Sequence, residues 1–309
     1  MSVERNIDGD RLEWPWLAVA LVGATDCVWA RRIGFHFKGL PEATLLIGVL
    51  LAIGFYYGTE GRNRRLRDLG HYLALWLVFP VVLNIYSYLA AAMRFPLCDV
   101  QLSILDESIG FHWLQWAKLI HHHRTATTLL FLSYNSIFIQ GFATVAYFAL
   151  TNNTRRNREL LWITMIAGSV TVAISGFIPA LGPMTAGHLP EWTSVLLKVR
   201  DGSMTSTALW DMKGIVAFPS FHTVLGLVFV YVHRPPCKTF IPVTALNALM
   251  LISIPFMGHH YLTDTIAGTV VTILAIVSYR IAVSAPAREY QAVRVAAQSA
   301  ASIYQVERP

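Results

Sequence analysis

The chain is poor in charged side chains. Only 14% of its 309 residues are Asp, Glu, Lys or Arg, whereas 55% are hydrophobic. Soluble globular proteins carry about 25% charged residues, so this composition leaves too little polar surface for a soluble domain. The apolar residues gather in several runs of roughly 18 or more, each long enough to cross a bilayer as a helix. The sequence therefore predicts an all-α, polytopic bundle of transmembrane helices.

Cysteine is scarce as well. Cys27, Cys98 and Cys237 are scattered, odd in number and without metal-ligand spacing, which argues against a disulfide framework and against a zinc site. We also expect neither a metal nor a cofactor. The first residues lack a basic region followed by a short apolar core, so we also expect no cleaved signal peptide.

About eight apolar segments are candidate membrane spans. They are Trp14–Ala30, Pro41–Gly58, His71–Ala92, Ala126–Leu150, Glu159–Ile178, Ile215–Val232, Phe240–Phe256 and Tyr261–Ile281. Between the third and fourth lies Phe95–Arg124, whose aromatic and acidic residues predict an amphipathic helix at the membrane surface. We divide the chain into N-terminal spans (1–95), the interfacial helix with a catalytic membrane core (96–284) and a cytosolic tail (285–309).

Polar residues of the interfacial segment are expected to face water. Asp99 and Asp106 are seven residues apart, so they share one face of a helix. We expect that face to be the solvated side. The run His121–His123 has the composition of a metal-binding tract, but its position at the entrance of a span favours an interfacial polar cluster.

Two short histidine motifs stand at the start of apolar runs. The first is AFPSFHT, around His222, and the second is GHHYLTDTIAG, around His260. His260 and Asp264 are four residues apart, which places them on one face of a helix. An aspartate that accepts a hydrogen bond from one imidazole nitrogen fixes the tautomer and leaves the other nitrogen nucleophilic. His260 is therefore the candidate nucleophile and Asp264 its orienting carboxylate.

The first motif supplies a candidate general acid. Pro219 suits the first turn of a helix, because its missing N–H is not needed there. The free N–H groups of that turn, together with the helix dipole, form a seat for a phosphate. His222 would face His260 across this phosphate and protonate the leaving oxygen. His259 is an alternative nucleophile, although its spacing of five from Asp264 fits a helical face less well.

Phosphate binding also calls for positive charge. Arg200 and Lys213 are, with Lys198, the basic side chains nearest the motifs in the loop before them. Arg200 is favoured because the planar guanidinium binds two phosphate oxygens at once. We expect Arg200, Lys213 and Ser220 to be the phosphate ligands.

Basic residues are unevenly shared between the two sides of the membrane. The N-terminus, the even-numbered loops and the C-terminus hold 15 of the 24 Lys and Arg residues. The positive-inside rule then puts both termini in the cytoplasm. Both histidine motifs and the loop Pro179–Gly214 fall on the outer or periplasmic face. The net charge of +6 thus reflects membrane topology, and we expect no nucleic-acid partner.

The two motifs resemble the second and third signature motifs of the type 2 phosphatidic acid phosphatase superfamily. They are most similar to its inositol-phosphotransferase branch, which includes the fungal inositol phosphorylceramide synthases. The similarity runs from about Phe111 to Arg280. It implies a bundle with a six-helix catalytic core and metal-independent phosphohistidine chemistry. By motif position, His260 would be the nucleophile, Asp264 its orienter and His222 the leaving-group acid.

The sequence departs from the phosphatases of that superfamily at two places. Ser253 and Ile254 stand where they carry Ser-Arg before the nucleophile. Their first motif, Lys-x6-Arg-Pro, is also missing from the loop before the first histidine motif. Because the transferase branch is similar in lacking that arginine, both departures favour a transferase.

The leading hypothesis is a membrane lipid phosphotransferase. It transfers a phosphoryl or phosphodiester group first to His260 and then to an alcohol. The first alternative is a lipid phosphate phosphatase, acting on phosphatidic acid or an isoprenoid phosphate with water as acceptor. A distant alternative is a proton or metal transporter, in which the histidines and Asp264 relay ions through the bundle. A structural scaffold is a further class. The partners we expect are a phospholipid or lipid phosphate and, for the transferase, an alcohol.

Overall fold

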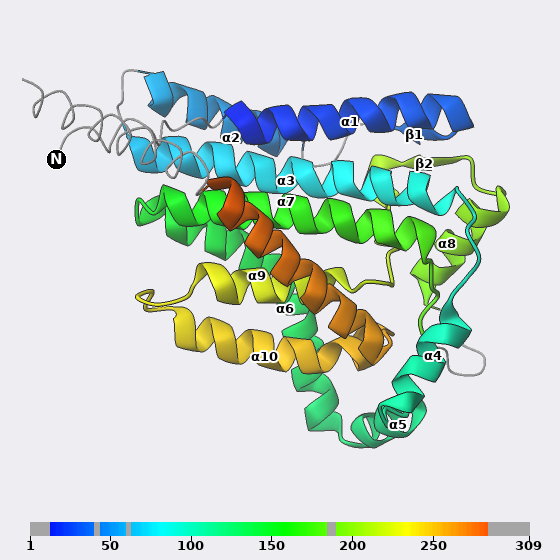
Figure 1. Ribbon diagram of the computed structural model, residues 1–309. Helices are drawn as coiled ribbons and strands as arrows, with labels where there is room; N and C mark the ends of the chain where they lie inside the picture. The colour runs from blue at the N-terminus through cyan, green and yellow to red at the C-terminus, as the bar shows by residue number, and fades with distance from the viewer. Residues whose placement is uncertain (1–12, 40–43, 60–62, 184–189, 284–309) are drawn as a thin grey trace, which may run out of the picture.

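The chain folds into a bundle of helices (Figure 1). The structure, a computed structural model, describes residues 13–39, 44–59, 63–183 and 190–283. The predicted tail 285–309 lies outside these ranges. The helical architecture confirms the predicted all-α class.

Within the described ranges, five helices are long and apolar enough to cross a membrane, so the chain is a multi-pass membrane protein. They are α3 (Arg64–Ala91), α6 (Arg124–Leu150), α7 (Thr154–Phe177), α10 (Phe240–Met257) and the last helix described, Leu262–Val283. Two further apolar helices, α2 (Thr44–Gly58) and α9 (Phe221–Val232), are shorter. Together with α1 (Glu13–Ile33), these helices occupy the eight segments that the sequence predicted as spans.

Helix α9 begins later than predicted. The apolar run starts at Ile215, but the helix starts at Phe221, after a non-helical segment. Ser220 is the N-cap, and its hydroxyl accepts a hydrogen bond from the Thr223 amide. Pro219 therefore precedes the cap instead of lying in the first turn, because the serine side chain already satisfies an amide of that turn.

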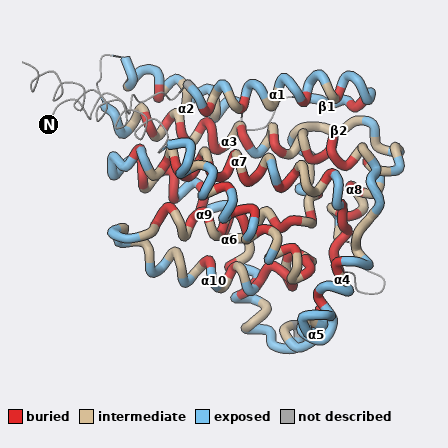
Figure 2. The backbone as a smooth tube through the Cα atoms, viewed as in Figure 1, coloured by how far each residue is buried: buried red, intermediate tan, exposed pale blue. Residues whose placement is uncertain are grey.

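Helix α3 lies at the centre of the N-terminal half and contacts α1, α2, α6 and α7 (Figure 1). Its contact with α2 depends on Gly70, where a Cβ would come within 2.4 Å of the Leu50 carbonyl oxygen. The buried positions follow the middle of the bundle (Figure 2). Residues of five helices share the largest core cluster: Leu75, Phe148, Leu160, Val228 and Met250.

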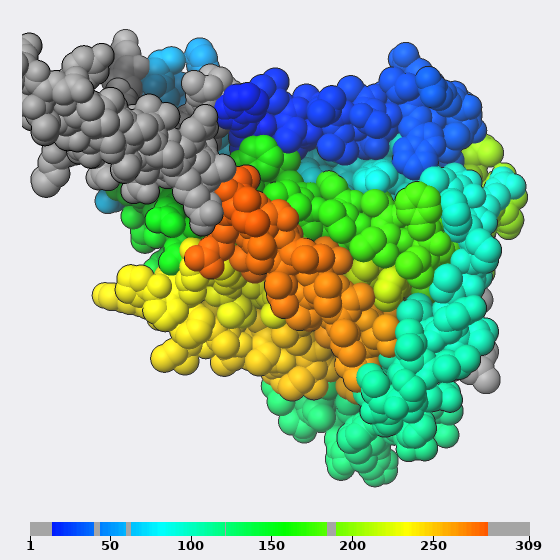
Figure 3. Space-filling model, in the orientation of Figure 1, coloured from blue at the N-terminus to red at the C-terminus, as the bar shows by residue number. Residues whose placement is uncertain are grey.

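The predicted interfacial helix is two helices. α4 (Asp99–Ser108) and α5 (Trp113–His122) are separated by a turn in which Gly110 has a φ of +78°. This left-handed conformation suits glycine and ends α4. In the space-filling view, the α4–α5 segment lies against the start of the orange last helix (Figure 3). The segment therefore borders the second histidine motif.

A two-stranded parallel sheet was not predicted. β1 (His36–Lys38) follows α1, and β2 (Ser206–Ala208) follows α8 (Glu191–Asp201). Strands of three residues carry too short a pattern to detect in a sequence. The pairing connects the N-terminal helices to the loop that leads into α9.

Candidate active site

His260 and Asp264 are joined by a hydrogen bond. His260 Nδ1 lies 3.0 Å from Asp264 Oδ2, which also accepts the Tyr261 N–H at 3.0 Å. Asp264 is fully buried and His260 is 4% exposed. His260 lies two residues before the last helix, not on the helical face that the spacing predicted. With Nδ1 bound to the carboxylate, Nε2 has no hydrogen-bond partner among the described residues, so its lone pair is available.

The two histidine motifs lie side by side. The Ser220 N–H donates to the Asp264 carbonyl oxygen at 3.1 Å. Gly268 makes this approach possible, because a Cβ there would lie 2.6 Å from the Ser220 carbonyl oxygen and 2.9 Å from Thr223 Cβ. The start of α9 and the start of the last helix therefore share one end of the bundle.

His222 is held by a tyrosine that the motifs did not reveal. Its ring stacks on Tyr134 of α6, with centroids 4.2 Å apart and planes 12° from parallel. The Tyr134 hydroxyl lies 3.4 Å from His222 Nδ1, and His222 Nε2 is buried with no partner in the described part of the chain. A Cβ at Gly258 would lie 2.6 Å from His260 Cδ2 and 2.8 Å from the Tyr134 hydroxyl, so both side chains pack closely against this glycine. The two histidines are close enough to interact electrostatically.

His259 lies in a different environment. Its φ of +54° turns the backbone, and its ring lies 6.3 Å from that of Trp113 on α5. Its carbonyl oxygen packs against Gly182, where a Cβ would come within 2.1 Å of it. The structure thus pairs Asp264 with His260, while His259 packs between α5 and the loop after α7.

Asp99 and Asp106 correct the prediction of a solvated face. They do share one face of α4, but that face contacts protein. Asp99 accepts the Leu181 and Gly182 N–H groups at 2.9 to 3.1 Å, and Asp106 is 2% exposed. The carboxylates find backbone donors there, which offsets the cost of removing them from water.

Burial shifts the pKa of two side chains at this contact, Tyr261 and Asp99. It raises the pKa of Tyr261 above its ordinary range, and the neighbouring Asp99 adds to the effect. The phenol therefore stays neutral and donates to Asp99 Oδ1 at 3.3 Å. Burial also raises the pKa of Asp99, while the amides of Leu181 and Gly182 oppose the rise.

A family model of the PAP2 superfamily matches residues 100–278. The chain belongs to the PAP2 superfamily. The matched part includes α4 and both histidine motifs, whereas α1, α2 and α3 precede it. No curated protein and no solved structure matches the chain. Membership in the PAP2 superfamily implies a phosphatase-type enzyme that acts on lipid phosphates in the membrane.

Of the three predicted phosphate ligands of this PAP2 protein, Ser220 lies beside the second motif, whereas Arg200 and Lys213 have other partners. The Arg200 guanidinium donates to the Phe95 carbonyl oxygen, and its Nη1 is buried without a partner among the described residues. Burial lowers the pKa of Arg200, and Asp99 opposes this. Lys213 Nζ lies 3.6 Å from Glu191 Oε1. Neither basic side chain contacts His222 or His260 through a hydrogen bond or ion pair within the described ranges.

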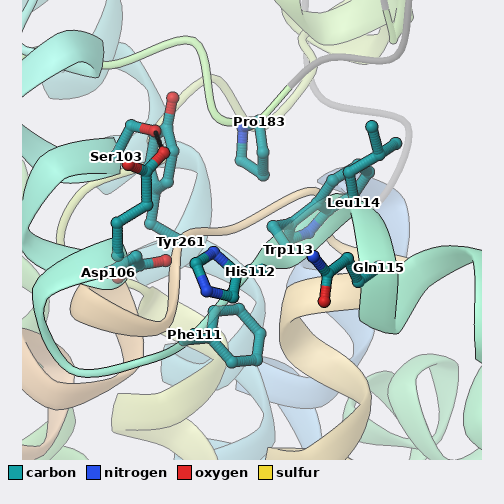
Figure 4. Close-up of a pocket in the computed structure, with 10 residues that line it drawn as sticks. Ser103, Asp106, Phe111, His112, Trp113, Leu114, Gln115, Pro183 and Tyr261 are labelled. Carbon is teal, nitrogen blue, oxygen red and sulfur yellow. Dashed lines mark hydrogen bonds between the residues drawn. The ribbon is translucent and has the colours of Figure 1, made fainter.

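A cavity of about 400 Å³ lies beside the second motif of the PAP2 protein (Figure 4). Its wall consists of residues from α4, α5 and two loops: Ser103, Asp106, Glu107, Phe111, His112, Trp113, Leu114, Gln115, Pro183 and Tyr261. Figure 4 shows His112 and Tyr261 on this wall. Tyr261, which follows His260 in the sequence, belongs to this wall, whereas His260 itself does not line the cavity. No lysine or arginine is part of the wall.

Proposed function

We propose that the protein is a membrane lipid phosphotransferase that works through a phosphohistidine at His260, as in the inositol-phosphotransferase branch of the superfamily. The observation that carries the proposal is the hydrogen bond between His260 Nδ1 and Asp264, which leaves Nε2 as the nucleophilic nitrogen. Ile254, where the phosphatases carry arginine, supports the transferase branch.

In the first step, His260 Nε2 attacks the phosphorus of a lipid phosphoester. The bond between phosphorus and the lipid oxygen breaks as the P–N bond forms. His222 Nε2 donates a proton to the leaving oxygen, and the Asp264 carboxylate stabilises the positive charge on the His260 ring. His222 must carry a proton for this step, and the nearby anionic phosphate favours that form.

In the second step, neutral His222 accepts a proton from the hydroxyl of an acceptor alcohol. The alcohol oxygen attacks phosphorus, the P–N bond breaks, and His260 is regenerated. Water in place of the alcohol gives a lipid phosphate phosphatase, which is the second candidate because superfamily membership implies a phosphatase-type enzyme. The scheme uses only side chains of this protein and the two substrates.

Charge on the phosphate would be balanced from the start of α9 and from the preceding loop. The Phe221 and His222 amides belong to the first turn of α9, where N–H groups have no acceptor within the helix and can bind an anion. Arg200 and Lys213 remain our predicted ligands, and the unpaired Arg200 Nη1 is a donor that a phosphate could satisfy. From the distribution of basic residues we place this site on the outer or periplasmic face.

The first prediction compares neighbouring histidines in purified protein. His260→Ala removes the nucleophile, so turnover of micellar phosphatidic acid and phosphatidylinositol should fall by at least about 10³-fold. His259→Asn is the matched comparison, since asparagine tolerates the positive φ of that position; it should retain the intermediate-forming step. Native turnover by His260→Ala would refute the proposal. Free phosphate as the product would indicate water as acceptor, and a new lipid would indicate an alcohol.

A further inference from the structure

The second histidine motif is anchored by a carboxylate from α4. Asp106 Oδ2 accepts the Leu262 N–H at 2.8 Å, and Oδ1 accepts the Thr263 N–H at 2.8 Å. The Thr263 hydroxyl also donates to Oδ1. These amides open the last helix and would otherwise lack acceptors. The carboxylate thus caps a helix from another segment, and the capped residues follow His260 by two and three positions.

The same face of α4 holds the other side of the motif. Asp99 accepts the Tyr261 hydroxyl at 3.3 Å and binds the loop at Leu181 and Gly182. Gly182 in turn packs against the His259 carbonyl oxygen. The backbone from His259 to Thr263 is therefore fixed at both ends by one short helix.

Asp106 has a second neighbour, the cavity. It belongs to the wall together with Phe111 and His112 (Figure 4). The buried Asp106 side chain therefore binds the backbone that follows His260 and also lines the cavity. A molecule in the cavity would lie against the same carboxylate that sets the position of His260.

We propose that Asp106 is a positioning residue of the phosphotransfer reaction, which holds the backbone after His260 and so aligns the His260 ring for attack on the substrate. The proposal rests on the proposed function of His260. Its physical basis is that nucleophilic attack needs the reacting atoms close together and aligned, and that a misplacement of about 1 Å can cost about 10²-fold in rate. The bonds from Leu262 and Thr263 are the contacts that prevent such a displacement.

The test is Asp106→Asn in the full-length protein, assayed with micellar phosphatidic acid and phosphatidylinositol. Asparagine keeps the size of the side chain but presents an NH₂ group where one acceptor stood, so one backbone amide faces a donor. We expect kcat to fall on the order of 10²-fold with little change in KM. Asp211→Asn is the control. This exposed aspartate makes no hydrogen bond or ion pair to other described residues, and its replacement should leave kcat unchanged.

The kcat and KM values separate positioning from a merely structural role, with thermal unfolding measured alongside. Native kcat in Asp106→Asn, with His260→Ala inactive, would overturn the positioning role and leave the proposed function intact. Native kcat in His260→Ala, or no turnover of either lipid by the unmodified protein, would overturn both. Should Asp106→Asn fail to fold, Thr263→Val decides: it removes only the hydroxyl contact, and an unchanged kcat would contradict the inference.

Discussion

The proposed chemistry of His260 depends on its hydrogen bond to Asp264 and on the residues that hold His222. Asp264 was predictable, because it is four residues away and the two side chains bond directly. Tyr134 and Asp106 were not predictable. Tyr134 lies 88 residues from His222 in the sequence, and Asp106 lies 156 residues from Leu262. A tyrosine in an apolar span and an aspartate in an amphipathic segment carry no local sign of such long-range contacts.

At this scale we predict the effect of Tyr134→Phe. The substitution keeps the ring stacked on His222 and removes the hydroxyl near Nδ1. A hydrogen bond of this kind contributes about 1 kcal/mol, so the rate of transfer should fall about fivefold without a loss of folded protein. Steady-state turnover by the purified variant measures this, with Tyr57→Phe on α2 as the control. An unchanged rate would show that the hydroxyl does not help to hold His222.

The helices were predictable where apolar runs are long, and less so where single residues set their ends. The core of α6 and of α10 follows hydrophobicity directly. The start of α9 at Phe221 depends instead on the cap at Ser220, and the break between α4 and α5 depends on Gly110. Hydrophobic periodicity averages over such positions, so it merged α4 and α5 and extended α9 backwards.

At the scale of elements, the contact between α9 and the last helix depends on Gly268. A methyl group there would lie 2.6 Å from a backbone oxygen, which has no freedom to move aside. Gly268→Ala should therefore lower the free energy of unfolding by about 1–3 kcal/mol and reduce turnover, because the two histidines are attached to these helices. Gly48→Ala on α2 is the matched control, since a Cβ there meets nothing within 4 Å. Thermal unfolding in detergent would measure both, and equal stability of the two variants would contradict the expected clash.

At the scale of the whole molecule, a cluster of arginines lies at the end of α9 that is remote from the candidate site. Helix α9 leads from His222 at its start to Arg234 just beyond its end. There Glu159 binds Arg234 at 2.8 Å and Arg156 at 3.3 Å. The basic cluster and the histidines thus lie at opposite ends of α9, as a protein with cytoplasmic arginines and an outward-facing site requires. Orientation in the membrane stays a prediction, and so does the division of the chain at residue 95.

The central claim is a covalent intermediate on His260. The direct measurement is mass spectrometry of the intact protein and its peptides, after brief reaction with phosphatidic acid or phosphatidylinositol and a quench at alkaline pH. We predict an adduct on His260 that is absent from His260→Ala, because the hydrogen bond from Nδ1 to Asp264 orients the ring and leaves Nε2 free to attack. The mass of the adduct would show whether a bare phosphoryl group or one that still carries the head group is transferred. An adduct on His259, or turnover without any adduct on His260, would contradict the account.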